Sequence, residues 1–234
     1  MVDATTYEQG NMHLAPEKAT KVDLSYNFSS QAVNLFVNGY LSHTTDYISQ
    51  MTKMDNERLI TTYANADSDI KTGVEVSLKV TPAKWMNFSV GANTYYVTTE
   101  GVFEGMHIDN QGWTNNSNLL LDFVPWKGGD LQLQYFITTP QYYPQLTTSL
   151  THQMNMGIKQ RFMKGAMTAS ILVTDVLNTA KWDVWSNNSL FNLKNSSTNK
   201  SRMIWLGVSY NFNSFKQKSN QKAETDRSLI KLGL

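Results

Sequence analysis

The chain has 234 residues, of which 20 are basic and 19 acidic, giving a formal charge of +1, with 41% hydrophobic residues and a mean hydropathy of -0.39. No segment approaches the roughly 18 consecutive apolar residues of a membrane-spanning helix, which excludes an α-helical membrane protein. The balanced charge offers no basic stripe for nucleic acid. The absence of cysteine excludes disulfides and thiolate chemistry, and it is compatible with a cell envelope.

The N-terminus, Met1–Glu8, lacks the basic segment and apolar core of a secretion signal. A protein of the outer cell envelope needs such a signal. Since the features below indicate that location, we expect this chain to be a fragment whose signal and N-terminal portion lie upstream of residue 1.

Apolar and polar residues alternate with period two in segment after segment, the pattern of a strand with two different faces. In the first segment Val22, Leu24, Tyr26 and Phe28 form the apolar set. No Asp, Glu, Lys or Arg belongs to any of the apolar sets. We predict about nine antiparallel strands, at residues 18–28, 31–42, 72–81, 85–97, 113–125, 130–139, 149–162, 166–175 and 201–213.

The connections between these segments alternate strictly between short and long. Short turns are expected near residues 29–31, 82–84, 127–129 and 163–165, and long polar loops at 43–72, 98–116, 139–150 and 176–200. A soluble β-sandwich would give the same alternation within strands, with its apolar face turned inward. Outer-membrane barrels combine short periplasmic turns with long extracellular loops, so the connections favour an all-β, antiparallel transmembrane β-barrel.

Two further observations agree with a membrane barrel. Trp85, Trp126, Phe162 and Phe212 lie at the short-turn ends of strands, where an interfacial aromatic girdle would place them. Nine is an odd number, whereas bacterial single-chain barrels have an even number of strands. We therefore expect these strands not to close on their own and to leave two unpaired edges.

The sequence resembles the C-terminal half of TonB-dependent outer-membrane receptors and of the closely related outer-membrane β-barrel family. The resemblance rests on three segments: residues 10–20 look like an extracellular loop entering a descending strand, residues 69–76 like a recurring strand, and residues 208–212 like a closing strand. It implies a 22-stranded barrel of which these would be the last nine strands, in contact with outer-membrane lipid. It also implies a plug, and a TonB complex engaged through the missing N-terminal region.

The last predicted strand also resembles the signal that the barrel assembly machinery reads. Its residues are Ile204, Leu206, Val208, Tyr210 and Phe212. The chain is accordingly divided into a partial outer-membrane barrel at 1–213 and a polar periplasmic tail at 214–234. The tail departs from the commonest family pattern, which leaves open whether this member is an active importer.

Catalytic and metal-binding patterns are weak throughout the chain. The four histidines, His13, His43, His107 and His152, lack the spacing of a metal site. The pairs Asp67/Asp69 and His107/Asp109 lack the run of oxygen ligands that calcium favours, and no serine sits in a nucleophile elbow. No enzyme activity and no cofactor are expected. Aromatics in the long loops could stack on a glycan or chelate, but loop packing explains them almost as well; they are Tyr142, Tyr143, Trp182 and Trp185.

The sequence thus leads to a fragment of a TonB-dependent receptor in the bacterial outer membrane that imports a scarce ligand, such as a siderophore or a glycan. The ligand itself is not identified. A non-transporting structural or adhesive outer-membrane barrel is the alternative, and a soluble all-β binding module is a third interpretation.

Overall fold

The computed structural model describes residues 6–55, 58–188, 191–198 and 200–212. Most of them lie in strands, joined by one short 3-10 turn, η1 (Met163–Gly165). None of the helical segments in these ranges is long and apolar enough to cross a membrane. The strands are β1 (Thr6–Glu8), β2 (Lys18–Ser29), β3 (Val33–Asp55), β4 (Arg58–Ala83), β5 (Met86–Phe103), β6 (Met106–Phe123), β7 (Gly129–Thr138), β8 (Thr147–Thr148), β9 (Thr151–Phe162), β10 (Met167–Thr174), β11 (Lys181–Asn187), β12 (Asn192–Thr198) and β13 (Met203–Tyr210).

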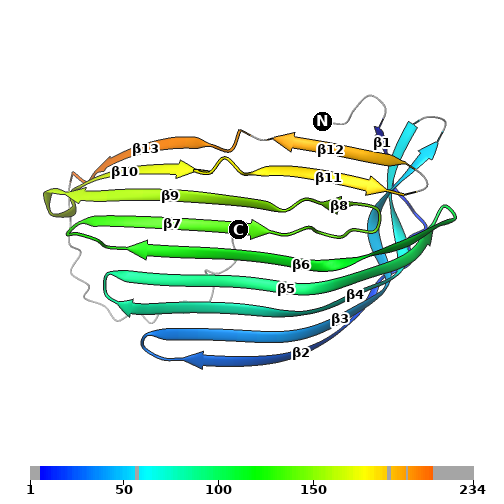
Figure 1. Ribbon diagram of the computed structural model, residues 1–234, viewed down its shortest axis with the longest axis horizontal. Coiled ribbons are helices and arrows are strands. Elements are labelled where there is room, and N and C mark those ends of the chain that lie inside the picture. Colours follow the sequence, from blue (N-terminus) through cyan, green and yellow to red (C-terminus); the bar gives the residue numbers. More distant parts are fainter. Residues whose placement is uncertain (1–5, 56–57, 189–190, 199, 213–234) are drawn as a thin grey trace.

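The main sheet is broad and curved, and its strands follow the order β13-β10-β9-β7-β6-β5-β4-β3-β2 (Figure 1). These neighbours are antiparallel, and they are the nine strands predicted from the sequence. The short β1 adds to β4 in parallel, and a second sheet has the order β12-β11-β8. Within the described residues β2 and β13 do not pair with each other, so both edges stay unpaired, as the odd strand count predicted.

The two ends of the sheet differ, as Figure 1 shows. At one end, here called the short-turn end, the chain reverses at residues 30–32, 84–85, 124–128 and 163–166, close to the predicted turns. At the other, the long-hairpin end, β3 and β4 continue to Asp55 and Arg58 and β5 and β6 to Phe103 and Met106. The positions of the four short turns are thus confirmed.

The prediction of long polar loops at 43–72 and 98–116 is wrong. Both stretches are the extended arms of two hairpins, and the remaining two long connections contain β8, β11 and β12. The sequence pattern did not predict these strands, because both faces of the arms carry Thr, Asn and Asp, which removes the period-two signal. Strand pairing nevertheless satisfies their backbone groups.

The β3–β4 hairpin bends where it leaves the main sheet. Thr45 pairs with Ser68 and Tyr47 with Ala66, but Asp46 between them adopts a left-handed backbone conformation, with φ 52°. The side chain of Asn65 donates to the carbonyl of Asp46 over 2.6 Å and fixes the bend. The tip of this hairpin consequently turns across the direction of the other strands (Figure 1).

Cross-strand register gathers the apolar residues on one face of the main sheet. Phe28 on β2 lies level, strand by strand, with Leu35, Leu78, Val90, Leu119, Tyr135 and Met154. Because side chains directly opposite one another point to the same side, this row crosses the sheet on a single face. Other side chains on the same face are exposed, for example Leu24 at 83% and Leu206 at 77%. The face therefore needs another apolar phase, such as lipid, rather than a second protein layer from the described residues.

The same register gives the tilt of the strands. Phe28 lies one residue before the end of β2 at the short-turn end, whereas the aromatic residue at that end of β9 is Phe162, eight residues beyond Met154. The ends of β2 and β9 are therefore offset by eight residues along the strands, which is about 26 Å. Across the strands they are separated by six strand spacings, which is about 29 Å. If both turns lie in one plane, the strands tilt by about 42°, within the roughly 35–45° of barrels.

Candidate functional site

The face opposite the apolar one is polar and is the candidate functional surface. Ser25 on β2 lies level with Asn38, Glu75, Asn93, Asn116, Thr138 and Thr151 across the sheet. Side chains link neighbouring strands, since Ser25 donates to Asn38 over 2.7 Å and Tyr40 to Asn93 over 2.9 Å. In a barrel whose outside meets lipid, this polar face lines the interior.

A buried ion pair lies on the polar face towards the long-hairpin end. The side chain of Asp69 is 5% exposed and lies 2.8 Å from the ammonium group of Lys71. Thr99 Oγ1 donates to the second carboxylate oxygen of Asp69, also over 2.8 Å. A paired and hydrogen-bonded carboxylate tolerates burial, so this cluster fixes β4 against β5 rather than offering a reactive group.

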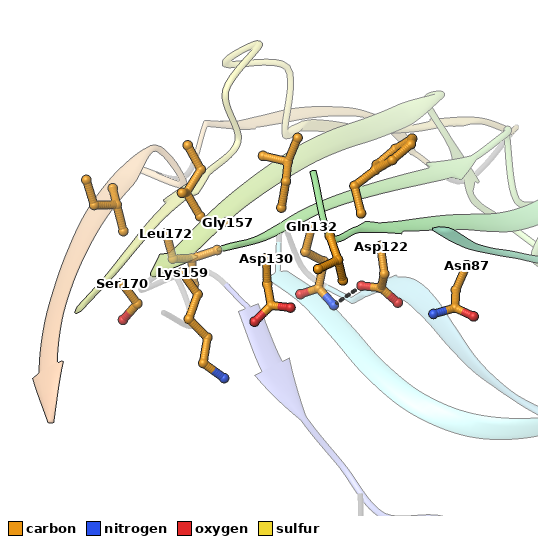
Figure 2. A pocket seen from close by; sticks show the side chains of 13 residues that line it. Asn87, Asp122, Asp130, Gln132, Gly157, Lys159, Ser170 and Leu172 are labelled. Carbon is orange, nitrogen blue, oxygen red and sulfur yellow. Dashed lines mark hydrogen bonds between the residues drawn. The ribbon is translucent and has the colours of Figure 1, made fainter. Parts of the chain in front are cut away.

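A groove of about 520 Å³ crosses the polar face at the short-turn end. In Figure 2 the side chains of Asn87, Asp122, Asp130, Gln132 and Lys159 project to one side of the sheet. Gln132 donates to Asp122 over 2.8 Å, which joins β7 to β6. The groove thus combines carboxylates, amides and a cation that all face the interior.

The charges of this groove are partly paired. Arg161 on β9 contacts the Asp130 carboxylate at 2.9 Å. Lys159 lies directly opposite Asp130 in the register and is exposed. Because the side chains of Arg161 and Asp130 are 44% and 34% exposed, their pairing contributes little to stability. They give the interior wall hydrogen-bonding groups for a polar solute or for another polypeptide segment.

At the long-hairpin end the two hairpins pack on each other around a small apolar core. Met51 is fully buried and Ala66 is 1% exposed, and they cluster with Ala64, Met106 and Ile108. Lys53 also forms a 2.6 Å ion pair with Glu104 at the β5–β6 turn. The arms of the β3–β4 and β5–β6 hairpins therefore form a compact unit, here called the cap, beyond the main sheet.

Two neighbouring segments fasten onto the cap. Gln145, from the connection between β7 and β9, accepts from the Thr52 N–H over 2.6 Å and donates to the Thr52 carbonyl over 3.1 Å. Asn11, ahead of β2, donates to the Tyr63 carbonyl over 2.9 Å. The segment that resembles an extracellular loop entering a descending strand thus lies at the long-hairpin end and leads into β2, as that resemblance implied.

The connection between β10 and β13 is organised around Asp175, whose side chain is fully buried. Its carboxylate accepts from the N–H groups of Thr179 and Ala180 and from the Ser201 hydroxyl. Burial alone would raise the pKa of this carboxyl, but these hydrogen bonds and the nearby Arg202 lower it below its ordinary value. Asp175 is consequently charged over the whole neutral range and ties both ends of the connection together.

The residues of the expected closing-strand signal lie on the edge strand β13 or just after it. Ile204, Leu206, Val208 and Tyr210 alternate along the apolar side, and Tyr210 packs edge-on against Phe212 with ring centroids 4.8 Å apart. Phe212 is 90% exposed. The structure thus places these side chains on one face at an unpaired edge, while their recognition by assembly machinery stays a prediction. The tail expected at 214–234 lies outside the described residues.

The girdle residues fit the same geometry. Trp85 stacks on Phe123 with ring centroids 6.1 Å apart, and Trp126 donates to Gln160 over 2.6 Å. Trp85, Trp126 and Phe162 are each about half exposed. They form an aromatic rim at the short-turn end of the apolar face, where an interface between lipid and water would need one.

Sequence reasoning did not find the cap, Asp175 or the groove. Their residues are far apart in the chain, for example Thr52 and Gln145, and no local pattern announces such contacts. The described residues contain no group of three or more His, Cys, Asp or Glu side chains placed to hold a metal ion. His107 and Asp109 nevertheless line one small cavity together with Trp185. The sequence pattern gave no reason to place Trp185 beside them.

Comparison with known proteins gives one family match. A family model described as the outer membrane protein beta-barrel family matches residues 1–210. The comparison with curated proteins finds no significant match. The matched range includes all strands of both sheets.

Proposed function

This chain belongs to the outer membrane protein beta-barrel family and is a protein of the bacterial outer membrane, and from that premise we propose that it forms wall and external hairpins of a TonB-dependent receptor importing a scarce ligand. In this proposal the apolar face contacts lipid and the short-turn end faces the periplasm. The cap stands outside the cell, and the chain itself performs no chemistry.

The observation that carries the proposal is the polar inner face of a sheet that stays open after nine antiparallel strands. Barrels of about eight strands fill their interior with side chains, whereas much larger ones enclose a lumen. An open sheet of this width supports a barrel of the larger kind. The continuous polar row from Ser25 to Thr151 and the groove beside Asp122 support an interior that accepts a polar solute or plug.

The experiment measures uptake by cells with and without the gene, in strains with and without TonB. Depletion of labelled ferric siderophores and oligosaccharides from the medium is followed over time. We expect at least one of them to be taken up only when both the gene and TonB are present. Uptake that depends on the gene but persists without TonB would reject energised import. No gene-dependent uptake at all would favour a structural or adhesive barrel.

We further propose that β13 and Phe212 are read by the barrel assembly machinery. The support is their exposure on one face of an unpaired edge. Replacing Phe212 by Ala should lower the amount of folded protein in outer membranes. The matched control is Trp182→Ala, because Trp182 is also exposed but lies in the second sheet. Equal amounts of both variants would remove the assembly role.

A further inference from the structure

A cavity of about 200 Å³ lies at the long-hairpin end, away from the groove of the inner wall. It opens between the first residues of β6, the turn before β8 and the strand β11. Its lining includes His107, Asp109 and Asn110 from β6, Gln145 from the turn, Thr147 from β8, and Trp185 from β11. Three separate parts of the chain therefore meet around this cavity.

The walls of the cavity are held rigidly. Asn110 donates to the carbonyls of Tyr143 and Leu146 over 2.6 and 3.3 Å. The ring of Tyr142 lies where a side chain on Gly112 would stand, so only glycine permits this close approach. Gln145 is 6% exposed and fixed to the cap by its two hydrogen bonds to Thr52. A cavity formed in advance binds a ligand without the cost of ordering its walls.

The polar groups at the cavity are available to a ligand. Among the described residues, neither the Asp109 carboxylate nor the His107 ring has a hydrogen-bond or ion-pair partner. The main chain contributes as well. Phe103 and Met106 close a two-residue turn, and hydrogen-bonded pairs alternate in an antiparallel ladder. The N–H and C=O groups of His107 and Asp109 therefore point away from β5, towards the cavity.

Size and charge restrict the ligand. The volume of about 200 Å³ equals that of about seven water molecules, which is the scale of one sugar ring. The lining contains a carboxylate but no Lys or Arg, which disfavours anions. An extended peptide needs several free residues along a strand edge. The segment from Pro140 to Thr147 is already hydrogen-bonded to Thr114 and Asn110 of β6, so only the edge beside His107 and Asp109 is free. This short free edge disfavours an extended peptide as the ligand.

Trp185 supplies the remaining requirement. Trp185 is 38% exposed and lines the same cavity as Asp109 and Asn110. The C–H faces of a sugar ring pack on an aromatic surface, while hydroxyls at the ring edge bond carboxylates, amides and main-chain groups. We propose that this cavity binds one residue of a neutral saccharide at the cell surface, an inference that rests on the proposed receptor function and names its substrate class.

The test measures binding to the purified full-length protein in detergent, by saturation-transfer NMR. The probes are neutral oligosaccharides of glucose, mannose and galactose, with an oligogalacturonate, a ferric catecholate and a neutral hexapeptide as comparators. We expect a neutral oligosaccharide to bind and Trp185→Ala to weaken it by about tenfold or more. Asp109→Asn should also weaken it. Trp182→Ala is the matched control, because Trp182 is an exposed tryptophan of the same strand that does not line the cavity, and it should bind as the unaltered protein does.

The proposal is overturned if no neutral saccharide binds, or if Trp185→Ala and Trp182→Ala bind equally well. It is likewise overturned if only the anionic probes or the peptide show binding that depends on Trp185. Because binding needs no energy source, the result is separate from the uptake experiment. TonB-dependent uptake without saccharide binding removes only the substrate class. Saccharide binding with TonB-independent uptake removes only the receptor mechanism.

Discussion

The assignment of the two faces to lipid and to the interior predicts a large difference between adjacent residues of β7. Leu133 points to the apolar face, where it lies level with Leu121 and Met156, and Gln134 points to the polar face, level with Asn155. Both lie midway along a central strand. The substitutions Leu133→Lys and Gln134→Lys therefore place the same charge at the same depth on opposite faces.

A lysine facing lipid near the middle of the bilayer costs about 2–4 kcal/mol, whereas substitutions on a wetted surface usually stay within about 0.5 kcal/mol. A difference of about 3 kcal/mol corresponds to a change of over a hundredfold in the folding equilibrium. The free energy of unfolding is measured by urea titration of the full-length protein in lipid vesicles, followed by the gel shift of unheated samples. Equal costs for the two variants, or a larger cost for Gln134→Lys, would refute the lipid assignment.

Four further predictions concern packing and hydrogen bonds. Gly73→Ala should lower the folded fraction in the gel-shift assay, because the new Cβ would lie 2.5 Å from the Tyr95 Cβ, whereas Gly39→Ala meets nothing within 4 Å and should be neutral. Asp175→Asn should speed proteolysis of the β10–β13 connection at neutral pH, since weakened hydrogen bonds cost roughly 1–3 kcal/mol. The pKa of Asp175 is lowered on folding from its ordinary value of 3.8. The charged carboxylate therefore stabilises the folded connection fully above that value, and this stabilisation is lost as the pH falls through the folded pKa. The unaltered protein should become protease-sensitive only below about pH 4. Gln145→Ala should increase hydrogen exchange at the Thr52 amide without changing that of the main sheet.

The strands that could be predicted from the sequence are those with one apolar face and one polar face along their length. Val22 to Phe28 and Ile204 to Phe212 could be placed because apolar and polar residues alternate there. The arms beyond Asp46 could not, because polar residues lie on both faces over most of their length. Their few apolar residues, such as Met51 and Ala66, meet a core only through the partner hairpin.

The candidate sites depended still more on contacts between distant segments. Trp185 and Asp109 were each visible in the sequence, as a loop aromatic and as part of an incomplete calcium pattern. Their meeting at one cavity follows from the bonds of Asn110 to the turn before β8 and from the pairing of Trp185 with Thr147. Neither contact has a periodic signal, so only the three-dimensional arrangement supplies it.

The strict difference between the faces also explains why the register of the main sheet is well defined. A slip of one residue would turn every side chain of a strand to the other face. On β4 it would expose Glu75 and Lys79 to lipid and bring Val76 and Leu78 into the polar interior. A lysine near the bilayer centre would cost about 2–4 kcal/mol, and a carboxylate less. The irregularity in the β4–β5 ladder lies between Val80 and Ala83, beside the short turn, where such a penalty has fallen to about 0–1 kcal/mol. The apolar face thus holds the main sheet in register, while the cap is stabilised by an apolar core of its own.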